Sequence, residues 1–147
     1  MKTIILAEDD ADDREFFEEA LKEISIETTL TTVKDGAELM TVLDENLNEP
    51  PPPHVIFLDL NMPRKNGIEC LKEIRANPKH QKIPVVIFST SAYPDAVENS
   101  YSLGANCYIR KPNSHQLLKQ TIVTVLSLKF WEHNQQLPKA DFLLSIT

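Results

Sequence analysis

The feature that most constrains the fold is a regular alternation of short apolar runs with longer segments whose apolar residues recur every three to four positions. Runs such as 3–7 and 55–58 are apolar throughout, which is typical of strands buried on both faces of a sheet. We expect strands at 3–7, 28–33, 55–58, 83–88 and 107–109, and helices at about 12–24, 39–43, 66–76, 94–103 and 115–130. This order predicts an α/β fold with a mainly parallel sheet, helices on both faces and right-handed crossovers.

The charge distribution narrows the class of protein. The chain has 147 residues, which predicts one domain, and a globular composition with 41% hydrophobic and 25% charged residues. Residues 1–60 contain 16 acidic and 4 basic residues, a net charge of −12, whereas residues 61–147 contain 6 acidic and 11 basic residues, a net charge of +5. Since nucleic-acid affinity depends on cationic contacts with phosphates, the acidic first part argues against a nucleic-acid-binding protein.

Nothing in the sequence indicates a membrane or secreted protein. The longest apolar runs are a few residues each, whereas a spanning helix needs about 20. Glu8 follows the N-terminal apolar run too soon for a signal peptide. Cys70 and Cys107 lack the spacing of zinc ligands, so we expect reduced, buried thiols in a cytoplasmic protein without membrane association.

Polar side chains follow four of the five predicted strands, directly where each strand ends. Three acidic residues follow the first strand, Asp59 the third, three hydroxyl residues the fourth and Lys111 the fifth; the two triplets are Glu8-Asp9-Asp10 and Ser89-Thr90-Ser91. In open parallel sheets, ligands bind outside the carboxyl ends of the strands. We therefore expect these carboxylates, a hydroxyl and an ammonium group to converge at one edge of the sheet.

The residue types at this edge indicate phosphoryl chemistry with a divalent cation. Carboxylate oxygens are hard ligands that suit Mg²⁺, and a cation offsets the repulsion between them. Asp59, on the central strand, is the natural nucleophile, because a carboxylate can attack phosphorus to form an acyl phosphate. Lys111 supplies a second positive charge, and the Thr90 hydroxyl can bind a phosphoryl oxygen.

Four motifs, in order and at suitable spacing, resemble the signature of the receiver domain of two-component response regulators. They are Glu8-Asp9-Asp10, Asp59-Leu60-Asn61-Met62-Pro63, Thr90 and Lys111-Pro112, within a resemblance that covers about residues 1–128. The resemblance implies a flavodoxin-like, doubly wound (βα)5 fold with strand order 2-1-3-4-5. It also implies Mg²⁺-dependent transfer of a phosphoryl group from the phosphohistidine of a sensor histidine kinase to Asp59.

The same resemblance implies a metal site. Glu8 and Asp9 form its acidic pair, Asp9 and Asp59 bind Mg²⁺ directly, and Asn61 adds its backbone carbonyl oxygen. Glu8 stands where aspartate is commoner, which leaves open whether it binds Mg²⁺ directly or through water.

The resemblance further implies how the phosphoryl group is held and sensed. Thr90 and Lys111 bind its oxygens, and Tyr108 matches the aromatic switch position. Because Ser89 and Ser91 flank Thr90, either of them is an alternative source of the hydroxyl.

These features predict a single-domain response regulator that signals by protein–protein contact. We expect a phosphoacceptor signalling protein and not an enzyme, with slow self-phosphorylation and self-dephosphorylation at most. The alternative is a Mg²⁺-dependent phosphatase with an aspartyl-phosphate intermediate. Such enzymes usually carry the nucleophile on the first strand and have a cap over the substrate, which the sequence does not predict.

The C-terminal residues 129–147 are expected to extend the last helix and form a tail, too short for an output domain. Apolar residues on the last helix cover more than one face; they are Leu117, Leu118, Ile122, Val123, Val125, Leu126 and Leu128. We therefore hypothesise a homodimer through this helix, the strand at 107–109 and the tail. The stretch 104–112, with Phe130-Trp131, is similar to stand-alone receivers of the phytochrome response-regulator type, which makes a phytochrome a candidate kinase.

The remaining polar residues suggest ordinary surface positions. We expect the further acids of the first helix to form its solvated face; they are Asp12, Asp13, Glu15, Glu18 and Glu19. The four histidines show no partner spacing and are expected at the surface; they are His54, His80, His115 and His133.

Overall fold

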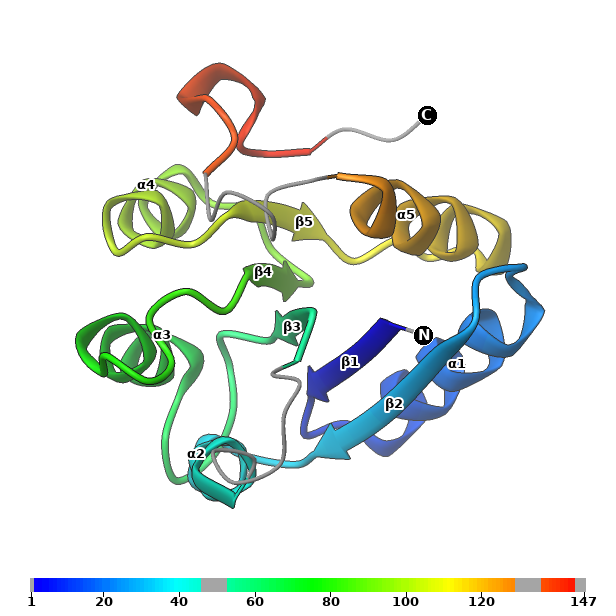
Figure 1. Cartoon of the computed structure of the whole chain (residues 1–147). Helices are drawn as coiled ribbons and strands as arrows, with labels where there is room; N and C mark the ends of the chain where they lie inside the picture. Colours follow the sequence, from blue (N-terminus) through cyan, green and yellow to red (C-terminus); the bar gives the residue numbers. More distant parts are fainter. Residues whose placement is uncertain (1, 46–52, 129–135, 145–147) are drawn as a thin grey trace.

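The computed structural model describes residues 2–45, 53–128 and 136–144 (Figure 1). The elements are β1 (Lys2–Ala7), α1 (Ala11–Glu23), β2 (Thr28–Val33), α2 (Gly36–Glu45), β3 (Val55–Leu58), α3 (Gly67–Ala76), β4 (Val85–Ser89), α4 (Pro94–Ser102), β5 (Cys107–Arg110), α5 (His115–Ser127) and a short 3-10 helix η2 (Lys139–Asp141). All strand pairs are parallel, in the order β2-β1-β3-β4-β5. The predicted fold class and strand order are confirmed.

The sheet separates two apolar clusters, with α1 and α5 on one face and α2, α3 and α4 on the other (Figure 1). Successive residues of each strand point to opposite faces. In β1, Ile4 and Leu6 pack towards α1 and α5, whereas Ile5 packs towards the other helices. In β5, Tyr108 packs on the α2–α4 face and its neighbours on the α1–α5 face. Both faces of the central strands are therefore buried, as their apolar sequence predicted.

Local sequence signals set where several elements begin or end. The Asp10 side chain accepts a hydrogen bond from the Asp13 amide and caps α1. Asn66 and Glu69 form a reciprocal capping box at the start of α3, and the Ser114 hydroxyl caps α5. After α4, Gly104 has φ +95°, a conformation that glycine adopts without a steric cost. The three N-terminal caps fix where these helices begin, beside the sheet edge that carries the polar residues, whereas Gly104 lies at the opposite edge, before β5.

The C-terminal part departs from the sequence expectation. Helix α5 ends at Ser127, a few residues before the expected end near residue 130. Phe130 and Trp131 lie outside the described residues. The described part of the tail, residues 136–144, does not continue the helix but folds back against β5, with an isolated parallel bridge between Tyr108 and Leu143. The domain boundary at residue 128 stays a prediction.

The histidines correct a second expectation, whereas the cysteines confirm one. His80 is buried and its Nε2 lies 3.2 Å from Asp44 Oδ1. His54 accepts a hydrogen bond from the Thr3 amide, and His115 pairs with Glu23; His133 lies outside the described residues. Cys70 and Cys107 are buried and free, as predicted. Within residues 2–45, 53–128 and 136–144, no helix is long and apolar enough to span a membrane.

Candidate functional site

The parallel ladder brings three charged residues to the carboxyl edge of the sheet. The first residue after β1, Glu8, donates its amide to the carbonyl of Val33 at 3.0 Å. The first residue after β3, Asp59, donates its amide to the carbonyl of Ala7 at 3.1 Å. Just beyond β5, the Lys111 amide donates to the carbonyl of Ser89 at 2.7 Å. These bonds extend the sheet pairing past the strand ends, so the backbone at all three positions is fixed.

Lys111 lies at the centre of the charged cluster. Its Nζ donates to Glu8 Oε1 and lies 3.3 Å from Asp59 Oδ2 and 3.2 Å from Asp13 Oδ2. Burial alone would lower the pKa of Lys111, but the hydrogen bond to Glu8 and the charges of the carboxylates outweigh it, and the pKa is raised. Lys111 therefore stays an ammonium group that partly neutralises the acidic residues.

Glu8 is the most buried carboxyl of the cluster, with 1% of the residue exposed. Burial raises its pKa to about 7, and the charge of Asp59 acts in the same direction. The hydrogen bonds from Lys111 and from the Asp10 amide oppose this rise. A cation beside Glu8 would favour its carboxylate form, because a positive charge lowers the pKa of a neighbouring carboxyl group.

Asp59 is held by the loop that follows β3. Its Oδ1 accepts a hydrogen bond from the Asn61 amide at 3.2 Å, which leaves Oδ2 directed towards Lys111. The start of α3 packs directly behind this loop: the Gly67 amide donates to the Leu60 carbonyl at 3.0 Å. A Cβ atom at Gly67 would overlap the Asp59 carbonyl oxygen, so glycine permits the close approach of the helix.

Three carboxyl groups fit the requirements of a divalent cation. Glu8, Asp9 and Asp59 each offer an oxygen atom, and these atoms all lie within 4.8 Å of one another. Mg²⁺ binds oxygen at about 2.0–2.1 Å, so ligands on its opposite sides are about 4 Å apart. Asp9 is exposed to solvent, which suits an ion that keeps several waters. The Arg14 guanidinium donates to the carbonyl oxygens of Glu8 and Asp9, both at 2.9 Å, and holds the loop that carries them.

On the other side of Asp59, β4 ends in hydroxyl groups, and β5 is followed by Lys111. Ser89 is fully buried, whereas Thr90 is exposed at the end of the strand. Thr90 and Lys111 both line a surface hollow of about 450 Å³. Tyr108 is buried, and its hydroxyl donates to the Ser91 carbonyl oxygen at 2.8 Å. Among the three adjacent hydroxyl residues, exposure and position favour Thr90 as a ligand for an incoming group.

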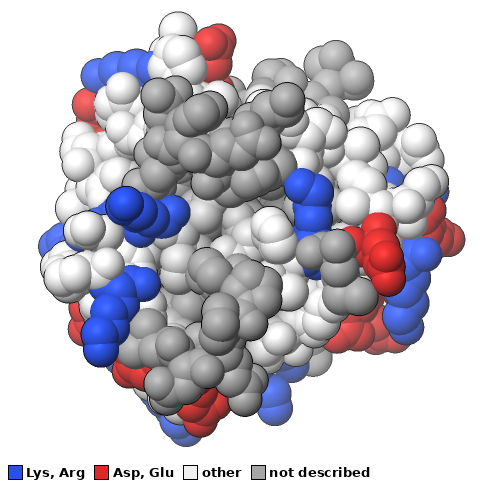
Figure 2. All heavy atoms as spheres, in the orientation of Figure 1, with Lys and Arg blue, Asp and Glu red and all other residues white. Residues whose placement is uncertain are grey.

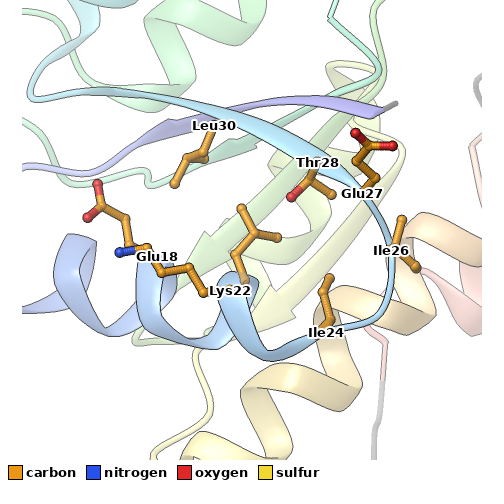
Figure 3. A pocket seen from close by; sticks show the side chains of 8 residues that line it. Glu18, Lys22, Ile24, Ile26, Glu27, Thr28 and Leu30 are labelled. Carbon is orange, nitrogen blue, oxygen red and sulfur yellow. The ribbon is translucent and has the colours of Figure 1, made fainter.

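Other features of the surface lack this convergence of polar groups. A hollow of about 530 Å³ lies between α1 on one side and β2 with its preceding loop on the other (Figure 3). Its wall combines apolar Ile24 and Leu30 with Glu18 and Lys22. On the face drawn in Figure 2, the described basic side chains are scattered among acidic ones rather than gathered in one patch. Neither feature brings catalytic groups together.

Sequence reasoning missed one member of the cluster. Asp13 was assigned to the solvated face of α1, but it pairs with Lys111, and its side chain is 44% exposed. The signal that could have found it is the cap: since Asp10 is the N-cap, Asp13 occupies the first turn of α1, beside the edge of the sheet. The other predicted site residues that the structure brings together at this edge are Glu8, Asp9, Asp59, Asn61, Thr90 and Lys111.

Comparison with protein families assigns the class. The family described as "Response regulator receiver domain" matches residues 4–123. Response regulator Rcp1 of Synechocystis sp. is 38% identical over 141 residues, which cover 95% of this chain and 95% of Rcp1. Chemotaxis protein CheY1 of Helicobacter pylori is 28% identical over 123 residues, covering 84% of this chain and 95% of CheY1.

Solved structures give the same result. The Mn²⁺-bound form of Rcp1 superposes with a TM-score of 0.76 at 37% identity, covering 94% of this chain and 99% of that chain. The phosphorylated cyanobacterial phytochrome response regulator RcpA superposes with a TM-score of 0.77 at 37% identity, covering 93% and 98%. The chain belongs to the response regulator receiver family of two-component systems, as its motifs predicted.

Proposed function

We propose that this protein is a single-domain receiver that accepts a phosphoryl group on Asp59 from a sensor histidine kinase and signals by protein contact. One observation carries the proposal: the Asp59 carboxylate lies beside the carboxyl groups of Glu8 and Asp9 and 3.3 Å from the Lys111 ammonium group, at the carboxyl edge of the sheet. The solved structure of phosphorylated RcpA, 37% identical, supports phosphorylation as the activating chemistry.

The transfer step follows from the geometry at Asp59. Its amide-bonded Oδ1 fixes the orientation of the carboxylate, and an oxygen of Asp59 attacks the phosphorus of a phosphohistidine. The new O–P bond forms as the P–N bond breaks, and the electron pair returns to the imidazole of the donor. Lys111, 3.3 Å from Oδ2, is within a small side-chain movement of an oxygen of the phosphoryl group on Asp59. The Thr90 hydroxyl donates to a second oxygen.

Glu8, Asp9 and Asp59 would hold Mg²⁺ together with the Asn61 carbonyl oxygen. The positive charge that the ion supplies when bound offsets the carboxylates and the phosphoryl oxygens. Two observations support this assignment: the three carboxyl oxygens fit one ion, and the similar Rcp1 has been solved in a Mn²⁺-bound form. Glu8 binds directly or through water, as the sequence left open.

Signalling follows from the hydroxyl side of the site. Contact of Thr90 and Lys111 with the phosphoryl group favours a state with altered loops and altered packing of Tyr108. Similarity to RcpA, a phytochrome response regulator, supports a phytochrome as the kinase.

The receiver acts in the cytoplasm, away from membranes and nucleic acids, and forms a homodimer through α5, β5 and the tail. A concentration-independent monomer mass in sedimentation would contradict the dimer.

The proposal is tested by phosphorylation of paired variants. Asp59→Asn removes the nucleophile and should abolish labelling by acetyl phosphate or a phosphorylated kinase in the presence of Mg²⁺. Asp12→Asn is the matched control, because Asp12 belongs to the same acidic run but is exposed, and it should label like the wild type. Equal labelling of Asp59→Asn would refute the assignment. Many turnovers per second on a small phosphoester would instead favour a phosphatase.

A further inference from the structure

The described C-terminal segment, residues 136–144, extends the sheet beyond β5 (Figure 1, red). The Tyr108 amide donates to the Phe142 carbonyl at 2.9 Å, and the Leu144 amide donates to the Tyr108 carbonyl at 2.9 Å. This is the pairing of a short parallel strand. The segment therefore occupies the outer edge of β5 at the residue that matches the switch position.

A second set of contacts anchors the beginning of the segment. The Leu137 amide donates to the Asn106 carbonyl at 3.0 Å. The Gln136 amide nitrogen Nε2 donates to the carbonyls of Tyr101 and Ala105, at 2.7 and 2.8 Å. The segment is consequently attached to both α4 and β5.

Phe142 is the apolar anchor of the segment, with 1% of the residue exposed. Its ring meets Tyr101 of α4 edge-on at 5.1 Å between centroids, and Tyr108 at 6.4 Å. The adjacent Leu143 is 44% exposed. Residues 139–141 are exposed as well. Phe142 is the only fully buried side chain of the described segment, and Leu137 and Leu144 are only partly buried against the α1–α5 cluster. The segment is therefore held less firmly than a strand such as β3, which is buried along its whole length, and this favours local opening.

The docked segment covers part of Tyr108, a residue that is fully buried. The backbone amide and carbonyl of Tyr108 are paired with the segment, its ring contacts Phe142, and its hydroxyl is bonded to Ser91. Leu144 also lines the hollow that contains Thr90 and Lys111. The segment thus pairs with β5 and reaches the hollow that Thr90 and Lys111 line, and Tyr108 is fully buried while Phe142 is in place.

We propose that residues 136–144 form a detachable strand of the same chain that locks Tyr108 in its buried position. Docking of the segment and burial of Tyr108 stabilise each other, because the site for Phe142 is formed in part by the buried tyrosine ring. Any outward movement of Tyr108 requires the segment to leave β5. The role of Tyr108 as a switch rests on the proposed function, but the lock is measured without a phosphoryl group, so each can fail independently.

The experiment compares Phe142→Ala with Leu143→Ala in the full-length protein. Phe142→Ala removes the anchor, and we expect amide hydrogen exchange at Tyr108 to accelerate by at least about tenfold. Leu143→Ala truncates the exposed neighbour and should leave the exchange rate unchanged. The Asp59 amide, which donates to β1, reports in both variants that the sheet remains folded. Unchanged Tyr108 exchange in Phe142→Ala would overturn the proposal.

Two further readouts separate the lock from simpler explanations. Nitration by tetranitromethane, mapped by mass spectrometry, should reach Tyr108 in Phe142→Ala but not in the wild type, with the 72% exposed Tyr93 as the internal reference. If the Tyr108 ring of Phe142→Ala stays unreactive while the Tyr108 amide exchanges faster, the proposed lock is contradicted. At a protein concentration where sedimentation shows the monomer, protection of the Tyr108 amide should persist; its loss in the monomer would place the segment on a second chain and overturn the proposal.

Discussion

On the β1 side of Asp59 the neighbouring groups are carboxyls, whereas on the β4 and β5 side they are hydroxyls, a phenol and an ammonium group. We call these the acidic side (Glu8 and Asp9) and the response side (Thr90, Tyr108 and Lys111). The acidic side is composed of the first residues after a buried strand and is tied to backbone amides. The response side adjoins the detachable segment. In the proposed function, the acidic side binds a cation and the response side reports the charge state of Asp59.

The largest expected effect separates transfer from metal binding. Lys111→Met keeps the aliphatic stem but removes the ammonium group, and we expect phosphorylation to slow by about 10²–10³-fold. Mg²⁺ affinity should not fall, because the ammonium group competes with the ion for Glu8 and Asp59. Phosphorylation kinetics and calorimetric Mg²⁺ titration check the two parts. Lys72→Met, at an exposed position on α3, is the control. A large loss of Mg²⁺ affinity in Lys111→Met would contradict the assignment of metal binding to the acidic side alone.

The acidic side should respond in the opposite way. Asp9→Asn removes one carboxylate from the three-oxygen cluster, and we expect Mg²⁺ affinity to fall by about ten- to a hundredfold. Calorimetric titration measures the loss, with Asp12→Asn as the exposed control from the same acidic run. Unchanged affinity in Asp9→Asn would remove Asp9 from the metal site.

The buried carboxyl of the acidic side should make stability depend on pH. The pKa of Glu8 is raised by burial from 4.5 to about 7 in the folded protein, so the unfolded chain loses this proton at a lower pH. Its stabilising contribution is present below pH 4.5 and is lost as pH rises towards about 7.

Denaturant unfolding with a chelator present tests this sign. The free energy of unfolding of the wild type, relative to Glu8→Gln, should fall by at most about 1.4 kcal/mol per pH unit in that window. Glu15→Gln, at an exposed position of α1, should show no such trend. A relative stability that rises with pH would contradict the buried environment of Glu8.

The smallest expected effect belongs to the response side. Tyr108→Phe removes only the hydroxyl that donates to the Ser91 carbonyl, which should lower the free energy of unfolding by about 1 kcal/mol. Mg²⁺ affinity should stay the same, since Tyr108 does not contact the acidic side. Tyr93→Phe, at an exposed residue, should change neither quantity. A Mg²⁺ affinity of Tyr108→Phe that differs from that of the wild type would show that the acidic side and the response side are coupled.

Most of the fold and of the site could be predicted because both depend on local patterns. Continuous apolar runs identified the strands. Because the carboxyl ends of parallel strands meet at the same edge of a sheet, the sequence alone predicted that Asp59 and Lys111 lie close together. Asp13 was missed because its contact depends on where the Asp10 cap starts α1. His80 was missed because its burial depends on the path of the chain after α3.

The C-terminal segment could not be predicted for a different reason. Within residues 136–144, polar and apolar residues alternate only from Lys139 to Phe142, and that stretch holds the 3-10 helix η2, so the segment carries little signal for a strand. Their pairing with β5 depends on a site that exists only after the sheet has formed, with Tyr101 and Tyr108 around Phe142.

The most direct test of the central claim is to locate the phosphoryl group. The protein is incubated with Mg²⁺ and acetyl phosphate, the acyl phosphate is reduced with borohydride to the corresponding alcohol, and the modified residue is mapped by peptide mass spectrometry. We predict conversion of Asp59 to homoserine in wild type and no modified residue in Asp59→Asn. Modification at Asp9, Asp13 or another carboxyl in place of Asp59 would contradict the account.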